Sequence, residues 1–386
     1  MSRRLTLLLP ALTLTLLACN GGGNGNGAAD EESADAAADA REEQEPVEQG
    51  PQNPYPEGRI DVVPGVIDIP KQEPIGLAVD DFGGMYIAFG MSSQVLFFTA
   101  ADGGSAYAGN GDPGDTGDGG LATEATLSRP TALALTTGGL YVVDEGRHRI
   151  RWVDKTTQVI EPFAGNGNPG DLGDGGPATE AELNSPRNLL IHGDYAYIAD
   201  RNNDSVRRID MRTGTIALFA GGADLGPSSP DGIQAAGARI KGPLGLACDG
   251  QLLYISENGG HKVRTVDLGT RVLGTAAGTG EGAYGGDNGP ARNGKLWSPG
   301  HLLLHDGKLY IADRNNYRLR VVVLSEQKIY SAAGTGVEGY GVGPSHSTQL
   351  GRIGQMALGP EGYIYFADPL LPDLGDKGTV RYYVLP

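Results

Sequence analysis

Short apolar runs alternate with glycine- and proline-rich segments along most of the chain, and no run has the length or period of an amphipathic helix. Within one unit, residues 132–135, 141–144, 149–154 and 159–163 have strand character and are separated by turn-forming residues. A tyrosine lies in the second run of every unit and recurs at steps of 55 to 57 residues, at Tyr86, Tyr141, Tyr197, Tyr254, Tyr310 and Tyr365. The pattern predicts six units of four short strands each.

Four strands repeated six times predict an all-β fold, a six-bladed β-propeller of four-stranded antiparallel blades. The last unit shows three strand-like runs before the chain ends. A run at residues 66–69, ahead of the first unit, resembles the fourth strand of the second unit, at residues 159–162. We therefore expect an N-terminal strand, residues 66–69, to pair with residues 382–385, complete the last blade and close the ring, because a closed ring hides sheet edges.

The repeated motifs resemble those of the NHL-repeat propellers. Tyr141-Val-Val-Asp144 is followed by His148-Arg-Ile-Arg-Trp-Val-Asp154, and Tyr310-Ile-Ala-Asp313 is followed by Tyr317-Arg-Leu-Arg320. The Gly-Asp-Gly-Gly-Pro-Ala-Thr-Glu-Ala segment at residues 173–181 is similar to the long-repeat variety of bacterial NHL proteins and teneurins. The first unit departs from the motif at Phe89 and Leu96. The resemblance implies a fold more than a function.

The N-terminus resembles a bacterial lipoprotein signal peptide. Two arginines precede an apolar run of 13 residues, 5–17, which is too short for the ~30 Å hydrocarbon layer of a membrane. Leu16-Leu-Ala-Cys19 is similar to a lipobox, which implies that residues 1–18 are removed and that Cys19 is the lipid attachment site. The resemblance implies an exported, lipid-anchored protein of a bacterial cell envelope, on its periplasmic or outer face. The alternative is an ordinary signal peptide with an incidental cysteine.

Residues 19–58 are predicted to be a disordered acidic tether rich in glycine and alanine, and residues 59–386 to form the propeller. Residues 30–49 contain nine acidic side chains against Arg41, too polar a composition to fold. The net charge of −17 and the export signal together exclude nucleic acid as a favoured partner. We expect a monomer that contacts the membrane through its lipid.

The long loops are predicted to share one face of the propeller. Strands alternate in direction, so inter-unit loops and second-to-third turns lie on the face opposite the short turns. Residues 112–130 and 168–186 are two such inter-unit loops and are identical at 13 of 19 positions. We expect these loops to be structurally dispensable and this face to be the binding face, because variable polar loops on a rigid scaffold commonly bind.

Arginine, asparagine and histidine side chains gather on the same predicted face. They can donate to carboxylates or sugar hydroxyls, and the ligand-binding candidates are Arg147, His148, Arg201, Asn202, Asn203, Arg314, Asn315 and Asn316. The neighbouring Asp144, Asp200 and Asp313 are more simply explained as Asx-turn caps of their own hairpins. Four arginines that recur ten residues after the tyrosine are expected to pair with backbone or acids between blades, namely Arg151, Arg207, Arg264 and Arg320.

Metal chemistry has weak support in the sequence. The glycine loops carry calcium candidates at Asp112, Asp115, Asp118, Asp171 and Asp174. Turn-forming aspartate is the alternative, because an EF-hand needs ligands at every second position. No other cofactor is predicted: of the six histidines only His301, with Asn188 as a neighbour, is expected to line the central channel.

These observations favour a recognition module for a protein or a cell-envelope polysaccharide, rather than an enzyme. No serine-nucleophile motif occurs, and no catalytic residue is assigned. The alternative function is a metal-dependent, lactonase- or lyase-like propeller enzyme with its site in the central channel.

The lipid anchor leads to a first prediction. Cys19→Ser is expected to release the protein from membranes, or to leave the precursor uncleaved, because the thiol that accepts the lipid is gone, while the propeller folds normally. Membrane fractionation and mass spectrometry of the N-terminus measure both effects. A Cys19→Ser protein that is processed and still sediments with membranes would contradict the lipobox.

Overall fold

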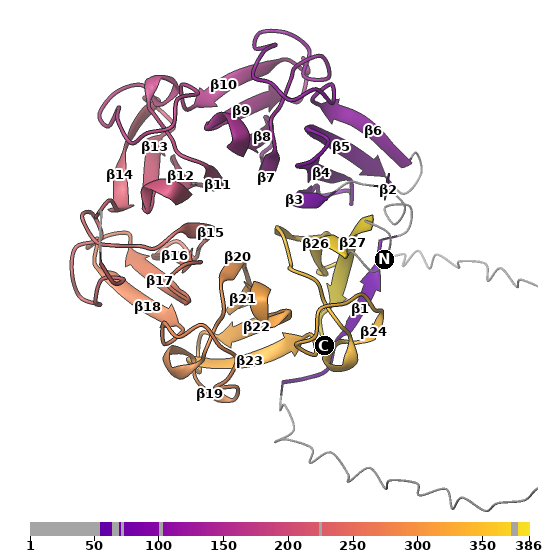
Figure 1. Cartoon of the computed structure of the whole chain (residues 1–386), viewed down its shortest axis with the longest axis vertical. Coiled ribbons are helices and arrows are strands. Elements are labelled where there is room, and N and C mark those ends of the chain that lie inside the picture. The colour runs from indigo at the N-terminus through magenta and orange to yellow at the C-terminus, as the bar shows by residue number, and fades with distance from the viewer. Residues whose placement is uncertain (1–54, 64–68, 71–72, 100–102, 224–225, 372–376) are drawn as a thin grey trace, which may run out of the picture. The chain divides into compact units, whose positions relative to one another are not determined.

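The computed structural model describes residues 55–63, 69–70, 73–99, 103–223, 226–371 and 377–386, which form a ring of six antiparallel sheets around a central channel (Figure 1). The predicted six-bladed β-propeller is confirmed. In the described part of the chain, no helix is long and apolar enough to cross a membrane.

The first five blades each consist of four consecutive strands, ordered from the channel outward. Blade 1 contains β3 (Pro74–Val79), β4 (Met85–Phe89), β5 (Gln94–Thr99) and β6 (Gly103–Ala108). Blade 2 contains β7 (Pro130–Leu135), β8 (Gly139–Asp144), β9 (Arg149–Asp154) and β10 (Ile160–Ala164). Blade 3 contains β11 (Pro186–His192), β12 (Tyr195–Asp200), β13 (Ser205–Asp210) and β14 (Thr215–Gly221).

The next two blades follow the same order. Blade 4 contains β15 (Pro243–Cys248), β16 (Leu252–Glu257), β17 (Lys262–Asp267) and β18 (Leu273–Ala277). Blade 5 contains β20 (Pro299–His305), β21 (Lys308–Asp313), β22 (Arg318–Val323) and β23 (Lys328–Ala333), with the short β19 (Gly289–Pro290) along its outer edge. The hydrophobic core lies between adjacent sheets: Tyr86 of blade 1, for example, is in one cluster with Leu140 and Val142 of blade 2.

The last blade combines both ends of the described chain. It contains β25 (Met356–Leu358), β26 (Ile364–Leu371) and β27 (Lys377–Val384), and β1 (Arg59–Val62) is its outer strand. β1 pairs antiparallel with β27 from Arg59 opposite Val384 to Val62 opposite Arg381. An N-terminal strand therefore closes the ring, as expected.

The segment that closes the ring differs from the one predicted. The closing strand is β1, and not residues 66–69; residues 64–68 lie outside the described residues, and Ile69 pairs with Gly378 at the other end of β27. Burial explains the choice, because Ile60 of β1 is 0% exposed in the core between blades 5 and 6. Upstream of β1, Tyr55 is also buried, and its ring lies 5.6 Å from that of Tyr330.

The inter-blade loops cover the outer edges of the blades. In blade 2, the amide of Gly119 donates to the carbonyl of Ile160 at 2.8 Å, and Leu121 forms a bridge with Val159. The loop before blade 5 does the same through β19, where Gly289 pairs with Ile329. Covering an edge strand blocks pairing with other chains. The expectation that these loops are dispensable was wrong.

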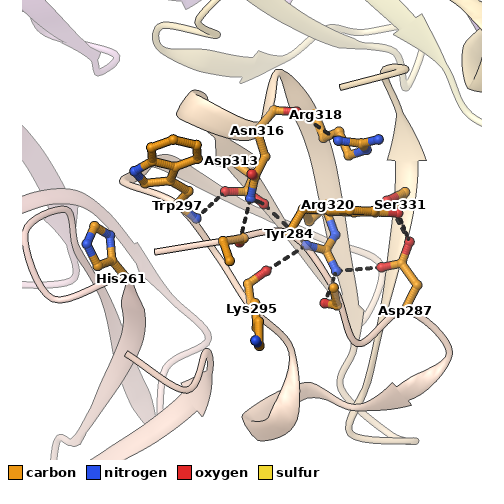
Figure 2. Close-up of polar contacts among 12 residues, drawn as sticks. His261, Tyr284, Asp287, Lys295, Trp297, Asp313, Asn316, Arg318, Arg320 and Ser331 are labelled. Carbon is orange, nitrogen blue, oxygen red and sulfur yellow. Dashed lines mark hydrogen bonds and ion pairs between the residues drawn. The ribbon is translucent and has the colours of Figure 1, made fainter. Parts of the chain in front are cut away.

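Each of these loops also contributes to a buried ion pair. In blade 5, the fully buried Arg320 of β22 donates to Asp313 at the end of β21 at 3.2 Å and to Asp287 of the preceding loop at 2.5 Å (Figure 2). A further donation, at 3.0 Å, goes to the carbonyl of Lys295. Two carboxylates from different segments thus neutralise one guanidinium.

The same arrangement recurs around the ring. Arg151, Arg207 and Arg264 are buried at the matching position and pair with one loop aspartate each, at Asp118 (2.8 Å), Asp174 (2.5 Å) and Asp231 (3.2 Å). Arg381 of blade 6 donates to Asp368 at 2.7 Å. The predicted pairing of the repeated arginines with acids and backbone is confirmed.

The closing strand leads to a second prediction. Ile60→Ala is expected to lower the free energy of unfolding by about 2–5 kcal/mol, because it leaves a cavity where β1 packs into the core. Urea unfolding measures the effect. The control is Asp61→Ala on the same strand, whose exposed ion pair with Arg59 is expected to contribute less than about 1 kcal/mol. Equal losses in the two variants would show that β1 does not hold the ring closed.

The buried arginines lead to a third prediction. Asp287→Ala is expected to lower the free energy of unfolding by up to about 3 kcal/mol, because Arg320 keeps only one of its two carboxylates. The control is Asp112→Ala, an exposed aspartate of an equivalent loop, for which a change within about 0.5 kcal/mol is expected. Unfolding of both variants at the same urea concentration would contradict a structural role for the loop aspartates.

Candidate functional site

A small cavity lies where the inner strands begin, on the face of the long loops. Its volume is about 70 Å³, and its polar lining consists of Glu73, Arg129, Thr131, Arg187 and Arg314. Ile75, Leu244, Gly354 and Pro369 complete the wall, so the six blades all contribute to it or flank it. We call this cavity and its polar lining the channel mouth.

Two repeated features of the blades place these side chains. In blades 1 to 5 the inner strand begins with a proline, and the residues flanking it meet around the axis: Glu73 precedes Pro74, Arg129 and Thr131 flank Pro130, and Arg187 follows Pro186. The second feature is the turn between the second and third strands. In blades 2, 3 and 5 this turn is a 3₁₀ helix, η1 (Glu145–Arg147), η3 (Arg201–Asn203) and η5 (Arg314–Asn316).

Glu145 neutralises part of the positive charge at the channel mouth. Its Oε2 lies 3.1 Å from Nη1 of Arg187 and 3.5 Å from Nε of Arg129. The Glu145 side chain is only 7% exposed, so these pairs are better shielded from solvent than ordinary surface pairs. Arg129 and Arg187 are therefore tied to blade 2 through one carboxylate.

Arg314 differs from its neighbours in having no such partner. Within the described residues it makes no hydrogen bond or ion pair, and its Nε is buried. Burial and the charges of Arg187 and Arg352 lower the pKa of Arg314 to about 10, while Glu73 acts in the opposite direction. Arg314 thus remains a cation, but one in an unfavourable surrounding.

Two of the predicted ligand-binding residues belong to this region. Arg314 lines the channel mouth, and Arg201 is close enough to Arg187 and Arg314 to influence the pKa of both guanidinium groups. Arg147, at the end of η1, is half-buried and does not line the cavity.

The predicted histidine and asparagines instead connect neighbouring segments. Nδ1 of His148 accepts a hydrogen bond from the amide of Ser185 at 3.0 Å. The remaining hydrogen bonds are those of Asn202 to Ser185 (3.0 Å), Asn203 to Asp200 (2.7 Å), Asn315 to Ser298 (3.2 Å) and Asn316 to Asp313 (2.8 Å). The bonds to Ser185 and Ser298 join the 3₁₀ turns to the loops beside them, and the bonds to Asp200 and Asp313 join the turns to the second strands. These side chains therefore have structural roles.

The aspartates at the ends of the second strands accept backbone hydrogen bonds from the preceding loops, and none from the backbone amides of their own turns. Asp144, Asp200 and Asp313 accept from the amides of Ser128, Asn184 and Trp297, each at 2.7 Å. Their expected role as Asx-turn caps was therefore wrong, although the role is structural. Burial raises the pKa of Asp144 and of Asp200 to about 7.

Polar side chains also connect the blades inside the channel. Nδ2 of Asn188 lies 3.2 Å from Nδ1 of His301, which confirms the predicted neighbours. The Gln355 amide accepts from the amides of Leu77 (2.9 Å) and Leu133 (2.8 Å). Burial, together with Arg314 and Arg187, lowers the pKa of His301 to about 3, so its imidazole is neutral at physiological pH. These residues border a wider cavity of about 300 Å³ lined mainly by leucines of the inner strands.

Cys248 lines this wider cavity and is half-buried. Burial raises the pKa of its thiol. No three histidine, cysteine, aspartate or glutamate side chains gather to hold a metal ion within the described ranges. Of the calcium candidates, Asp118 and Asp174 are engaged with arginines, and calcium binding by Asp112, Asp115 and Asp171 stays a prediction.

Comparison with known proteins places the chain among propellers. No family model matches it. The protein SUPPRESSOR OF QUENCHING 1 of Arabidopsis thaliana is 30% identical over 57% of this chain and 22% of that protein. NHL repeat-containing protein 2 of Gallus gallus is 30% identical over 48% of this chain and 27% of its own length. Human teneurin-4 is 28% identical over 61% of this chain and 9% of its own length. The chain thus spans 27% or less of these relatives.

Solved structures support the same architecture. An auxiliary nutrient binding protein from Bacteroides thetaiotaomicron superposes with a TM-score of 0.58 at 12% identity, over 85% of this chain and 77% of that chain. A gluconolactonase from Xanthomonas campestris gives a TM-score of 0.54 at 14% identity, over 85% and 90% of the two chains. At these identities the likeness concerns the fold alone. With its repeated motifs and six sheets closed into a ring, the chain is a six-bladed β-propeller with NHL-type repeats, similar in sequence to NHL repeat-containing protein 2 and teneurin-4.

Proposed function

We propose that this protein is a recognition module that binds an acidic polysaccharide of the cell envelope at the channel mouth. The observation that carries the proposal is the gathering of Arg129, Arg187, Arg201, Arg314 and Arg352 at one end of the channel. Only Glu73 and Glu145 oppose them in the electrostatic surroundings of Arg187 and Arg314. The channel mouth is therefore a positively charged region in a protein whose net charge is −17.

The geometry supports binding of an anion. A concave opening lined by one sign of charge concentrates the electrostatic field and raises the local concentration of oppositely charged ligands. The surrounding 3₁₀ turns are fixed by hydrogen bonds to neighbouring loops, so the arginines are presented by a rigid frame. Rigid presentation lowers the entropy lost on binding.

The size of the opening favours a polysaccharide over a protein partner. A cavity of about 70 Å³ admits one functional group, such as an acid group on a sugar chain. A stable protein interface buries roughly 800 Å² on each partner around an apolar centre. A nutrient binding protein shares the fold, and a lipid on Cys19 would present the channel mouth to polymers outside the membrane.

Affinity electrophoresis of the full-length protein tests the proposal, as the fourth prediction. Polygalacturonate in the gel is expected to retard the protein, dextran is not, and salt is expected to weaken the retardation, because the attraction is electrostatic. Arg201→Gln is expected to reduce the retardation by removing one cation beside the mouth.

The matched control is Arg212→Gln, an arginine with a 68% exposed side chain in a turn between the third and fourth strands of blade 3. That turn belongs to the face opposite the channel mouth, so the retardation of the variant should equal that of the native protein. Equal retardation of Arg201→Gln and Arg212→Gln, or equal retardation by dextran, would refute binding at the mouth.

A further inference from the structure

Arg314 stands apart from the buried arginines of the third strands. Arg320, six residues later in the same blade, has two carboxylate partners, whereas Arg314 has none among the described residues. Removing a guanidinium from water without a partner lowers stability. No bonded partner among the described residues therefore offsets the cost of holding the Arg314 guanidinium there.

Gly300 gives Arg314 its position over the channel. A Cβ on Gly300 would lie 2.5 Å from Cδ of Arg314, so any other residue would displace the arginine. The matching positions after the inner-strand proline carry side chains in other blades, such as Thr131 and Leu244. Blade 5 thus lacks a side chain at the one point where Arg314 needs the space.

Other polar groups at the channel mouth also have unused hydrogen-bonding capacity. Thr131 is 1% exposed, and its hydroxyl has no hydrogen-bond partner in the described structure. Nε of Arg187 is likewise buried without a partner. Both side chains line the same cavity as Arg314. A buried hydroxyl without a partner is unusual and calls for an occupant that accepts hydrogen bonds.

The cavity limits the size and charge of that occupant. Its volume of about 70 Å³ is about half that of a ~150 Å³ cavity that binds a benzene ring, so it admits a carboxylate group but not a sugar ring. Glu73 lines the same cavity and Glu145 lies against Arg187, so two carboxylates already oppose added negative charge. A singly charged anion fits this balance better than a doubly charged phosphate.

We propose that Arg314, Arg187 and Thr131 form a receptor for one carboxylate group, carried by a sugar acid. A planar guanidinium can donate to both oxygens of a carboxylate, and the threonine hydroxyl supplies a further donor. The proposal rests on the proposed function and assigns the acid group that enters the mouth, whereas the rest of the sugar lies outside it.

The fifth prediction uses calorimetry and thermal unfolding of the purified full-length protein. D-galacturonate is expected to bind saturably and to raise the melting temperature, because a ligand that binds only the folded state stabilises it. Galactose, which lacks the carboxylate, is expected to do neither. Inorganic phosphate is expected to bind more weakly than galacturonate.

Arg314→Met tests the residue itself. It is expected to weaken galacturonate binding about tenfold or more, since hydrogen bonds to charged groups are lost. In the absence of ligand its melting temperature is expected to equal or exceed that of the native protein, because an unpaired cation is removed. Arg320→Met serves as the opposite control and is expected to lower the melting temperature, since it leaves Asp313 and Asp287 without their cation. Gly300→Ala keeps the guanidinium but displaces it, so it is expected to weaken binding as well.

The outcomes separate the receptor from the proposed function. If polygalacturonate retards the protein through Arg201 but galacturonate does not bind, the carboxylate receptor is overturned and the proposed function stands. If neither ligand binds, both are overturned. Phosphate binding as tight as galacturonate binding would indicate an unselective anion site and overturn the assignment to a carboxylate. An Arg314→Met protein that binds galacturonate normally and melts lower would make Arg314 a structural residue.

Discussion

In blades 2 to 5, the buried ion pair between the third strand and the preceding loop determines how the blade is built. A guanidinium such as that of Arg320 is stable out of water only when anions surround it, and these come from Asp313 at the end of the second strand and Asp287 of the inter-blade loop. The loop must then pass over the outer edge of the blade, where it also pairs with the last strand. Blade 1 has Phe89 and Leu96 at the corresponding positions, so an apolar pair replaces the ionic one there.

The same requirement determines which residues face the channel mouth. The acid at the end of the second strand is buried in the blade, and the residue that follows it begins the 3₁₀ turn beside the axis. In blades 2, 3 and 5 this residue is Glu145, Arg201 and Arg314. The structural position is constant, while the residue that occupies it varies from blade to blade. A ring of equivalent positions can therefore acquire an asymmetric set of charges without any change in the blades themselves.

The sequence predicted the blades well because their period and tyrosines are local and repeated. The closing strand was misplaced because residues 66–69 match a strand pattern, whereas Ile60 is chosen by burial against a blade hundreds of residues away. Arg201 and Arg314 were predicted from their repeated motif. Four residues of the site were missed, because only the packing of blades 1, 2 and 3 around the axis brings them together: Glu73, Arg129, Glu145 and Arg187. Two local features would have identified them. Glu73, Arg129 and Arg187 lie next to inner-strand prolines, and Glu145 follows the aspartate that ends a second strand.

Arg314 and Arg320 show how one blade separates stability from recognition. Arg320 is fully buried and has carboxylates within bonding distance, whereas Arg314 is partly buried and has none among the described residues. A side chain on Gly300 would displace Arg314 from the axis, and a bonded acid would neutralise it. Among the described residues no carboxylate forms an ion pair with Arg314, although Glu73 lines the same cavity. An unpaired cation lowers stability unless something outside the chain pairs with it. The closed ring and its five buried arginine pairs supply the rigidity that lets the molecule keep this one group in an unfavourable state.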